Sequence, residues 1–258
     1  MLQDCMRTLA PLNDDAGDFL KLENIVCRDA KGNVFEQYDE IYLAKDIFRE
    51  QNGEGKLFTP YQAIAYSEQQ GLFLPSFALS CNILVALFNQ RDNPEAAKIL
   101  QQYKDYGPCY GWHAQNTIVD WGKQEIIHYP QDADFPSDGG NEKINKGRKR
   151  ISLGFQRKKL KNSSLEEALQ QGREFQTYLK NLTGLSDPAQ LIPLGKEWKI
   201  PAYVWISSSD KVRVAWLGCG SYFDLSADGD LNDDDAARGV RRRATAGSAS
   251  AKISKCKC

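Results

Sequence analysis

The chain has 258 residues and a formal net charge of −1, because 33 Lys and Arg balance 34 Asp and Glu. That balance excludes a general electrostatic attraction to nucleic acid or to anionic membranes, so any such attraction must be local. Hydrophobic residues make up 41% of the chain, which is enough to bury a core. A chain of this length forms one large globular domain or two small ones.

The sequence also constrains the compartment. Its longest apolar region, around residues 83–88, is far shorter than the 18 or so residues that a membrane span needs, so we expect no membrane span. The N-terminal residues contain no apolar segment typical of a secretory signal. The seven cysteines are scattered and odd in number, which predicts no disulfide framework. We therefore expect a reducing location, cytoplasmic or virus-associated.

The N-terminal third predicts a hairpin followed by a capped helix. Residues 1–21 show no period and are interpreted as a loosely ordered arm. Residues 22–26 and 33–38 predict two strands joined by a turn at Gly32, and residues 41–48 predict a further extended segment. Thr59 is a candidate N-cap with Pro60 at the first helical position, and Gly71 can adopt the positive φ that ends a helix.

The next elements are two helices and two strands. Residues 72–76 are expected to be extended, because the residue before Pro75 is pushed out of the α region. Apolar residues from Phe77 to Phe88 recur at helical spacing, and Asn93 and Pro94 open a third helix. Residues 117–120 and 125–129 then predict two strands joined by a tight turn.

A polar and basic stretch at residues 131–185 predicts an insertion. Residues 131–147 are rich in Asp, Gly, Asn and Lys and predict a loop. Nine Lys and Arg lie between residues 143 and 161 with only Phe155 among them as an aromatic, so a solvated surface is favoured over a nucleic-acid interface. Ser163 and Glu166 form a capping-box pattern, which predicts a helix from there to about residue 182 with a stop at Gly184.

The C-terminal third predicts strands followed by a tail. Residues 202–207 and 212–217 are rich in β-branched and aromatic residues and are interpreted as paired strands, and residues 237–241 as one more short strand. Residues 244–258 lack a core-forming pattern and are expected to be disordered. Cys256 and Cys258 could in principle hold a soft metal or bridge two chains, but an unstructured tail is favoured.

Three motifs carry a resemblance to a known family. They are Gly-Leu-Phe-Leu-Pro-Ser at residues 71–76, Val-Trp-Ile-Ser-Ser-Ser at 204–209 and Ala-Arg-Gly-Val-Arg at 237–241. Together with the order of elements, they resemble the variable proteins of diversity-generating retroelements, which have a C-type-lectin-like fold. The resemblance implies a single α+β domain over residues 22–243, with a small, mainly antiparallel twisted sheet flanked by helices and with its N- and C-terminal strands close together.

The segment at residues 219–235 is the candidate ligand-binding surface. Apolar residues alternate there with polar ones, so the apolar set can anchor a winding loop while the polar set points outward. Asn, Asp, Ser, Gly and Tyr are all reachable from an Asn codon by changing adenines, which the resemblance implies is how such proteins diversify. Tyr, Ser, Gly and Asn are also favoured in antibody-like binding surfaces. The candidate ligand-binding residues are Ser221, Tyr222, Asp224, Ser226, Asp228, Asp230, Asn232, Asp233, Asp234 and Asp235.

Two other interpretations of this segment stay open. Its spacing from residue 224 to residue 235 matches an EF-hand-type loop, with oxygens at positions 1, 3, 5, 9 and 12 and glycine at position 6. Position 9 is Asn232, and the residues predicted to hold a calcium ion in this alternative are Asp224, Ser226, Asp228, Asp230 and Asp235. Against calcium, the preceding residues predict a strand and no helix, and position 12 is an Asp. The other alternative is that the acids form a solvated loop.

The sequence contains no recognisable catalytic motif. His113 and His128 are the only histidines and have no metal-ligand spacing, and Cys219 between two glycines has no assignable base. The sequence therefore favours a non-enzymatic protein without a cofactor. Its expected ligand is a protein or another macromolecule, and the carboxylates favour a cationic or hydrogen-bond-donating protein surface over nucleic acid.

Overall fold

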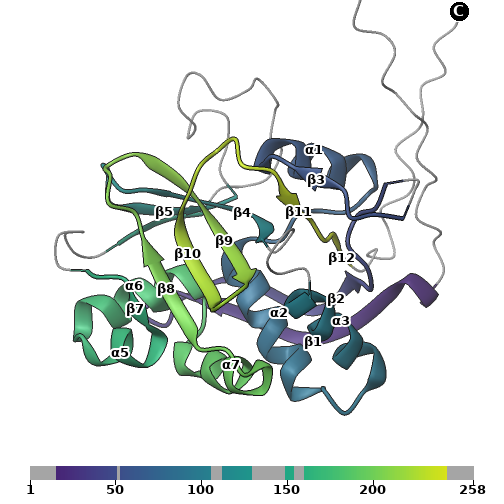
Figure 1. Ribbon diagram of the computed structural model, residues 1–258, viewed down its shortest axis with the longest axis horizontal. Helices are drawn as coiled ribbons and strands as arrows, with labels where there is room; N and C mark the ends of the chain where they lie inside the picture. The colour runs from purple at the N-terminus through teal and green to yellow at the C-terminus, as the bar shows by residue number, and fades with distance from the viewer. Residues whose placement is uncertain (1–15, 51–52, 106–111, 130–148, 154–159, 243–258) are drawn as a thin grey trace, which may run out of the picture.

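The computed structural model describes residues 16–50, 53–105, 112–129, 149–153 and 160–242. In these residues the chain forms six α-helices and two β-sheets (Figure 1). The predicted α+β class is confirmed. The expectation of one small sheet was wrong, because the chain forms a sheet of three strands and a second sheet of nine strands. The predicted ligand-binding segment, residues 219–235, contributes a strand to the second sheet. The predicted loop at 131–147 and the tail at 244–258 lie outside the described residues.

The first sheet brings the two ends of the domain together. Strands β1 (Phe19–Arg28) and β2 (Val34–Ala44) form the predicted antiparallel hairpin, and β12 (Val240–Arg242) pairs antiparallel with β2. The proximity expected for the terminal strands is thus confirmed. The predicted arm ends too late, because Phe19 and Leu20 are buried and already belong to β1.

Three helices follow, and the N-caps predicted for the first and third are present. Helix α1 (Pro60–Gln69) begins after Thr59, whose hydroxyl accepts from the backbone N–H of Gln62, and Gly71 beyond its end has φ of +68°. Helix α2 (Phe77–Asn89) is capped by Ser76, and α3 (Pro94–Asp105) begins at the predicted proline. Short-range capping patterns therefore placed these helices correctly.

The second sheet runs in the order β3-β11-β4-β9-β10-β8-β7, and β5 adds to β4 and to β6. Its long central strands are β4 (Trp112–Asp120), β9 (Val212–Cys219), β10 (Phe223–Gly229) and β8 (Ala202–Ile206). The shorter ones are β3 (Leu57–Phe58), β5 (Glu125–His128), β6 (Lys149–Ser152), β7 (Ser163–Ser164) and β11 (Asp235–Ala236). The predicted pairing of residues 202–207 with 212–217 was wrong, because β10 lies between them, parallel to β8 and antiparallel to β9.

The predicted helix at 163–182 is two helices, α5 (Leu165–Gln170) and α6 (Arg173–Thr183). Gly172 separates them with φ of +109°, and Gly184 ends α6 with φ of +65° as expected. The capping box is shifted by one residue, to Ser164 and Glu167. Helix α6 buries apolar side chains against α2, including Phe175, Tyr178 and Leu182. This part of the predicted insertion therefore belongs to the core.

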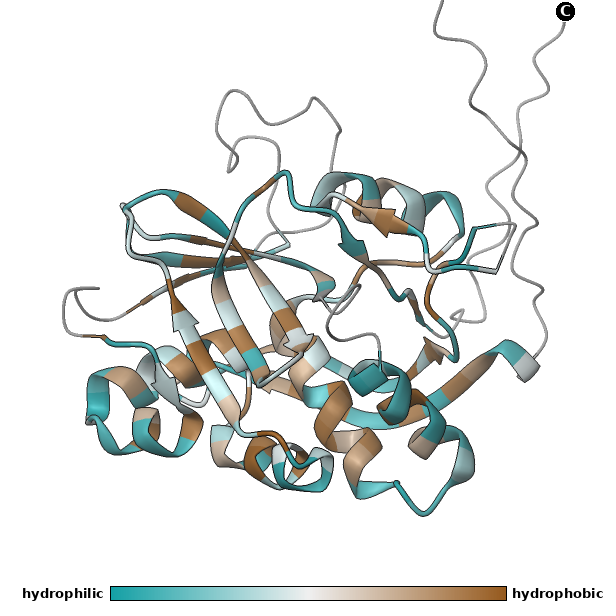
Figure 2. Cartoon of the chain, viewed as in Figure 1, coloured by the Kyte–Doolittle hydropathy of each residue, from teal (hydrophilic) through white to brown (hydrophobic). Residues whose placement is uncertain are grey.

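The main core lies between one face of the second sheet and the helices. Leu217, Leu225 and Val204 from neighbouring strands join side chains of α2 and α6 in one buried cluster. Helices α2, α5, α6 and α7 (Ile192–Trp198) lie on this side of the strands in Figure 1, and the apolar bands of α2 stand out in Figure 2. Short 3-10 turns at Ala16–Asp18 and Pro188–Leu191 complete the described elements. None of the described helices combines the length and apolar character that crossing a membrane requires.

Candidate ligand-binding face

Strand β10 organises the candidate site. Its residues alternate as the sequence predicts: Phe223, Leu225 and Ala227 belong to the main core, so Asp224 and Ser226 lie on the opposite face of the sheet. That opposite face is not freely solvated, because Asp224 is 8% exposed and Ser226 1% exposed. The expectation that these two side chains point outward into solvent was wrong, because the segment is an inner strand of the sheet instead of a winding loop.

The ten predicted residues therefore fall into two groups. Asp224, Ser226 and Asp235 are buried. The exposed ones lie in the turn before β10, at its end and in the connection to β11: Ser221, Tyr222, Asp228, Asp230, Asn232, Asp233 and Asp234. The connection between β10 and β11 gathers most of the acids.

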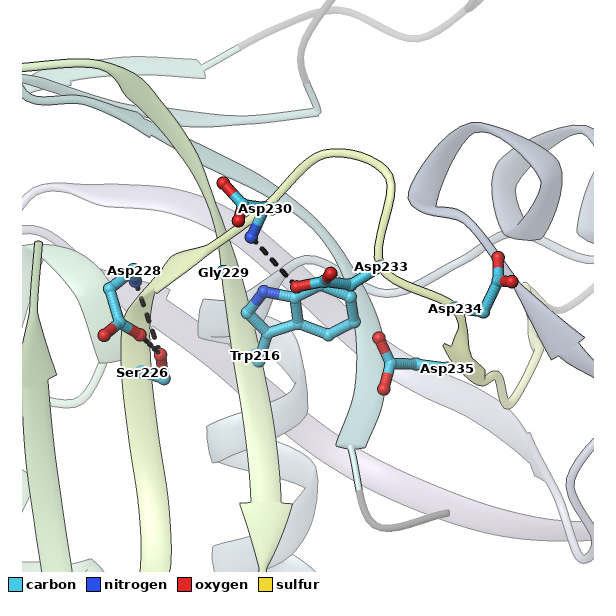
Figure 3. A pocket seen from close by; sticks show the side chains of 8 residues that line it. All are labelled: Trp216, Ser226, Asp228, Gly229, Asp230, Asp233, Asp234 and Asp235. Atoms are coloured by element: carbon cyan, nitrogen blue, oxygen red, sulfur yellow. Dashed lines mark hydrogen bonds between the residues drawn. The ribbon is translucent and has the colours of Figure 1, made fainter. Parts of the chain in front are cut away.

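An open cavity of about 440 Å³ lies at this connection. It is lined by Trp216, Ser226, Asp228, Gly229, Asp230, Asp233, Asp234 and Asp235 (Figure 3), and we call it the acidic cleft. Six of the ten predicted residues line it. The other four, Ser221, Tyr222, Asp224 and Asn232, do not. Figure 3 shows the carboxylates arranged around the indole of Trp216, which comes from the neighbouring strand β9.

Trp216 and Gly229 are site residues that the sequence did not single out for binding. A Cβ placed on Gly229 would lie 1.2 Å from Nε1 of Trp216, so the indole occupies the space where a side chain at position 229 would stand. Trp216 pairs with Ser226 across the antiparallel ladder. The glycine in the Asp-Gly-Asp sequence therefore makes room for the aromatic side chain of the acidic cleft.

Local hydrogen bonds shape the cleft. The hydroxyl of Ser226 donates to the carboxylate of Asp228, and the backbone N–H of Asp230 donates to Asp233 Oδ2 at 3.1 Å. Arg213 on β9 forms an ion pair with Asp230. One carboxylate is thus neutralised by a guanidinium of the chain itself, while Asp228, Asp233 and Asp234 make no ion pair in the described part of the chain.

Asp235 is the most perturbed acid of the cleft. Its side chain is 5% exposed, and Oδ2 has no hydrogen-bond partner among the described residues. Burial, reinforced by repulsion from Asp233 and Asp234, raises the pKa of Asp235 to about 8. Burial also raises the pKa of Asp233. The cleft therefore concentrates more carboxyl groups than the single guanidinium of Arg213 neutralises.

Asp224 faces an aromatic group at the other end of β10. Its Oδ1 accepts a hydrogen bond of 2.6 Å from Nε1 of Trp205. Burial raises the pKa of Asp224 to about 6, although the indole N–H opposes that shift. The ring of Tyr203 lies between those of Trp205 and Tyr222, with centroids 4.8 Å from each. Sequence reasoning missed Tyr203 and Trp205, although their alternation with buried Ala202, Val204 and Ile206 indicated one outward face.

The calcium interpretation does not match this geometry. Residues 224–229 are extended in β10 and residues 235–236 form β11, so the stretch is a strand, a turn and a strand. An EF-hand loop instead wraps around its ion between two helices. In the described ranges no three His, Cys, Asp or Glu side chains are arranged to hold a metal ion. The backbone of this segment therefore differs from that of an EF-hand loop, and calcium binding stays a prediction.

In the described part of the chain, the two histidines and Cys219 are buried. His113 is 2% exposed and His128 fully buried, and burial lowers the pKa of His113 to about 3 and that of His128 to about 4. Cys219 is buried as well, and burial raises the pKa of its thiol. These groups are neutral at physiological pH and lie outside the acidic cleft.

No protein-family model, curated protein or solved structure matches this chain. The site is therefore interpreted from its own chemistry.

Proposed function

We propose that this chain is a non-enzymatic ligand-binding protein with a C-type-lectin-like fold, and that its acidic cleft binds a cationic group of a protein target. The observation that carries the proposal is the gathering of Asp228, Asp233 and Asp234 around one open cavity with Trp216. Carboxylates that share a cavity repel one another, and a bound ammonium or guanidinium group relieves that repulsion. They would also repel phosphate groups, which argues for a protein target over nucleic acid.

The position of the cleft supports a role in binding. It lies on the sheet face opposite the main core, at the connection between two strands, so binding there leaves the core undisturbed. Surface connections held by a rigid sheet are common sites of recognition. The pairing of β12 with β2 brings the two ends of the domain together, in keeping with a C-type-lectin-like scaffold.

We further propose that the exposed residues of this segment are diversified, as in the variable proteins of retroelements. Sibling sequences should then differ at Tyr222, Asp228, Asp230 and residues 232–234, which are exposed, while Phe223 and Leu225 stay apolar. A reverse transcriptase gene nearby, with a template repeat that differs only at adenines, would support this origin. A segment that is invariant among siblings would contradict it.

The binding proposal is tested with a fluorescein-labelled, arginine-rich nonapeptide and its glutamate-rich counterpart, by fluorescence anisotropy. Wild type should bind the arginine peptide, more weakly at high salt because the attraction is electrostatic. The triple variant Asp228→Asn/Asp233→Asn/Asp234→Asn should bind about tenfold more weakly or worse. The control, with equal loss of charge at exposed positions elsewhere, is Asp39→Asn/Asp92→Asn/Asp105→Asn.

The control separates a specific cleft from general acidity. If both triple variants weaken binding equally, net charge and not the cleft attracts the peptide. If wild type binds the glutamate peptide and not the arginine peptide, the proposal of a cationic target is wrong.

A further inference from the structure

Three aromatic side chains form a second accessible surface on the same sheet face. Tyr203 and Trp205 come from β8, and Tyr222 lies in the turn that precedes β10. Tyr222 is 37% exposed, and among the described residues only Val34 and Leu57 are comparably exposed large apolar side chains. Tyr203 and Trp205 are half-buried. We call these three residues the aromatic platform.

The rings of the platform touch one another. Tyr203 is 4.8 Å from Trp205 and 4.8 Å from Tyr222, and the Trp205 and Tyr222 rings meet edge to face at 6.3 Å. These separations are those of rings in direct contact, so nothing can enter between them. A ligand must instead lie across their outer faces.

A carboxylate makes this surface attractive to cations. Asp224 accepts the indole N–H of Trp205 at the ring edge, which places negative charge beside the rings and leaves the ring faces electron-rich. In the parallel ladder Asp224 lies beside Tyr203 and Ser226 beside Trp205, so the carboxylate lies on the sheet face that carries the platform.

The chain does not supply the cation itself within its described part. Elsewhere its own guanidinium groups stack on rings, as with Arg241 over Phe19 and Arg242 over Phe73. No described Lys or Arg lies over a ring of the platform. Among the described residues, the platform therefore differs from these other rings in having no cation stacked on it.

We propose that the aromatic platform is a second subsite of the ligand-binding face, where an arginine side chain of the protein target stacks on the rings beside Asp224. The inference rests on the proposed function. The platform and the acidic cleft adjoin along β10, because Ser226, which lines the cleft, lies beside Trp205 in the ladder. An extended basic segment that runs along β10 would therefore contact both surfaces. A planar guanidinium stacks on aromatic faces better than an ammonium group does.

The test uses the same arginine-rich nonapeptide, a lysine version, and a version whose terminal arginine is replaced by neutral citrulline. Tyr222→Ala and Trp205→Leu should each weaken binding of the arginine peptide by about 2- to 30-fold. Both variants should bind the citrulline peptide as wild type does. The matched control is Leu57→Ala, which removes an exposed apolar side chain elsewhere. Circular dichroism and thermal melting confirm that each variant is folded, and Trp205→Phe, which keeps a ring but loses the N–H, replaces Trp205→Leu if it unfolds.

The outcomes separate the two subsites. If the asparagine triple variant of the cleft loses binding while Tyr222→Ala and a folded Trp205→Leu bind normally, the platform proposal is overturned and the proposed function stands. If wild type binds the citrulline and lysine peptides as tightly as the arginine peptide, the platform does not recognise a guanidinium, and the inference is wrong. If no basic peptide binds wild type, both proposals fail.

Discussion

Replacing Asp235 by Asn should change how the stability of the protein depends on pH. The folded pKa of Asp235 is about 8, whereas an unfolded aspartate titrates near 3.9. At a pH between these two pKa values, Asp235 has lost its proton in the unfolded chain but keeps it in the folded protein. Folding stability therefore falls as pH rises through this interval, by at most about 1.4 kcal/mol per pH unit. Below pH 4 both states are protonated, and above about pH 8 both are ionised.

The upper limit of this effect is about 6 kcal/mol over the whole interval. An asparagine side chain has nearly the shape of a protonated aspartate and does not titrate, so Asp235→Asn should show a flatter curve and exceed wild type most at pH 8. The measurement is urea unfolding, followed by tryptophan fluorescence, between pH 5 and 8. Asp39→Asn, at an exposed position on β2 away from Asp235, is the control. If the wild-type and Asp235→Asn curves run parallel over this range, the buried, unpartnered carboxyl group of Asp235 is not as described.

Two further predictions concern the cleft and the core. Gly229→Ala should destabilise the protein by about 1–3 kcal/mol, because the added methyl group overlaps Trp216, whereas Gly220→Ala, with open space around its Cβ, should be nearly neutral in the same urea assay. His128 has its pKa lowered to about 4, so its contribution to stability is present above pH 6.5 and is lost as pH falls toward 4. His128→Gln should remove this part of the acid sensitivity, and thermal melting at pH 4.5 and 7 checks it, with an unchanged difference contradicting the assignment.

Local signals in the sequence predicted a large part of the fold. Thr59, Pro60 and Gly71 act on backbone groups a few residues away, so their roles can be read without the tertiary structure. The hairpin of β1 and β2 could also be predicted from local signals, because a turn at Gly32 separates two apolar stretches. Phe19 shows the limit of this approach, because its burial depends on partners across the sheet.

Strand order could not be predicted in this way. Residues 202–206 and 212–219 both have strong β-propensity, and adjacency in sequence suggested that they pair. The partner that separates them, β10, carries Asp224, Ser226 and Asp228, which made it look like a solvated connection. Period-two alternation was visible there, but alternation does not tell whether the polar face meets water or other side chains. The burial of Asp224 depends on Trp205, which lies 19 residues earlier in the chain.

Composition therefore identified the acidic residues of the candidate site, but it did not predict how they are arranged. Asp233 and Asp234 line the same cleft as Trp216 because β11 pairs with β4. The space at Gly229 that the indole fills cannot be recognised in the sequence. The resemblance to variable retroelement proteins drew attention to this segment, and both that family and the function of the segment stay proposals.

The most direct test of the ligand-binding face is to watch its indole groups while the arginine-rich nonapeptide is added. In ¹⁵N-labelled protein, the indole N–H signals of Trp216 and Trp205, assigned with Trp→Phe variants, should shift in a saturable way. The signal of Trp198, buried against Phe223 in the core, should stay in place. Shifts confined to Trp198 or to regions away from β10, or no saturable shift at all, would contradict the proposed site.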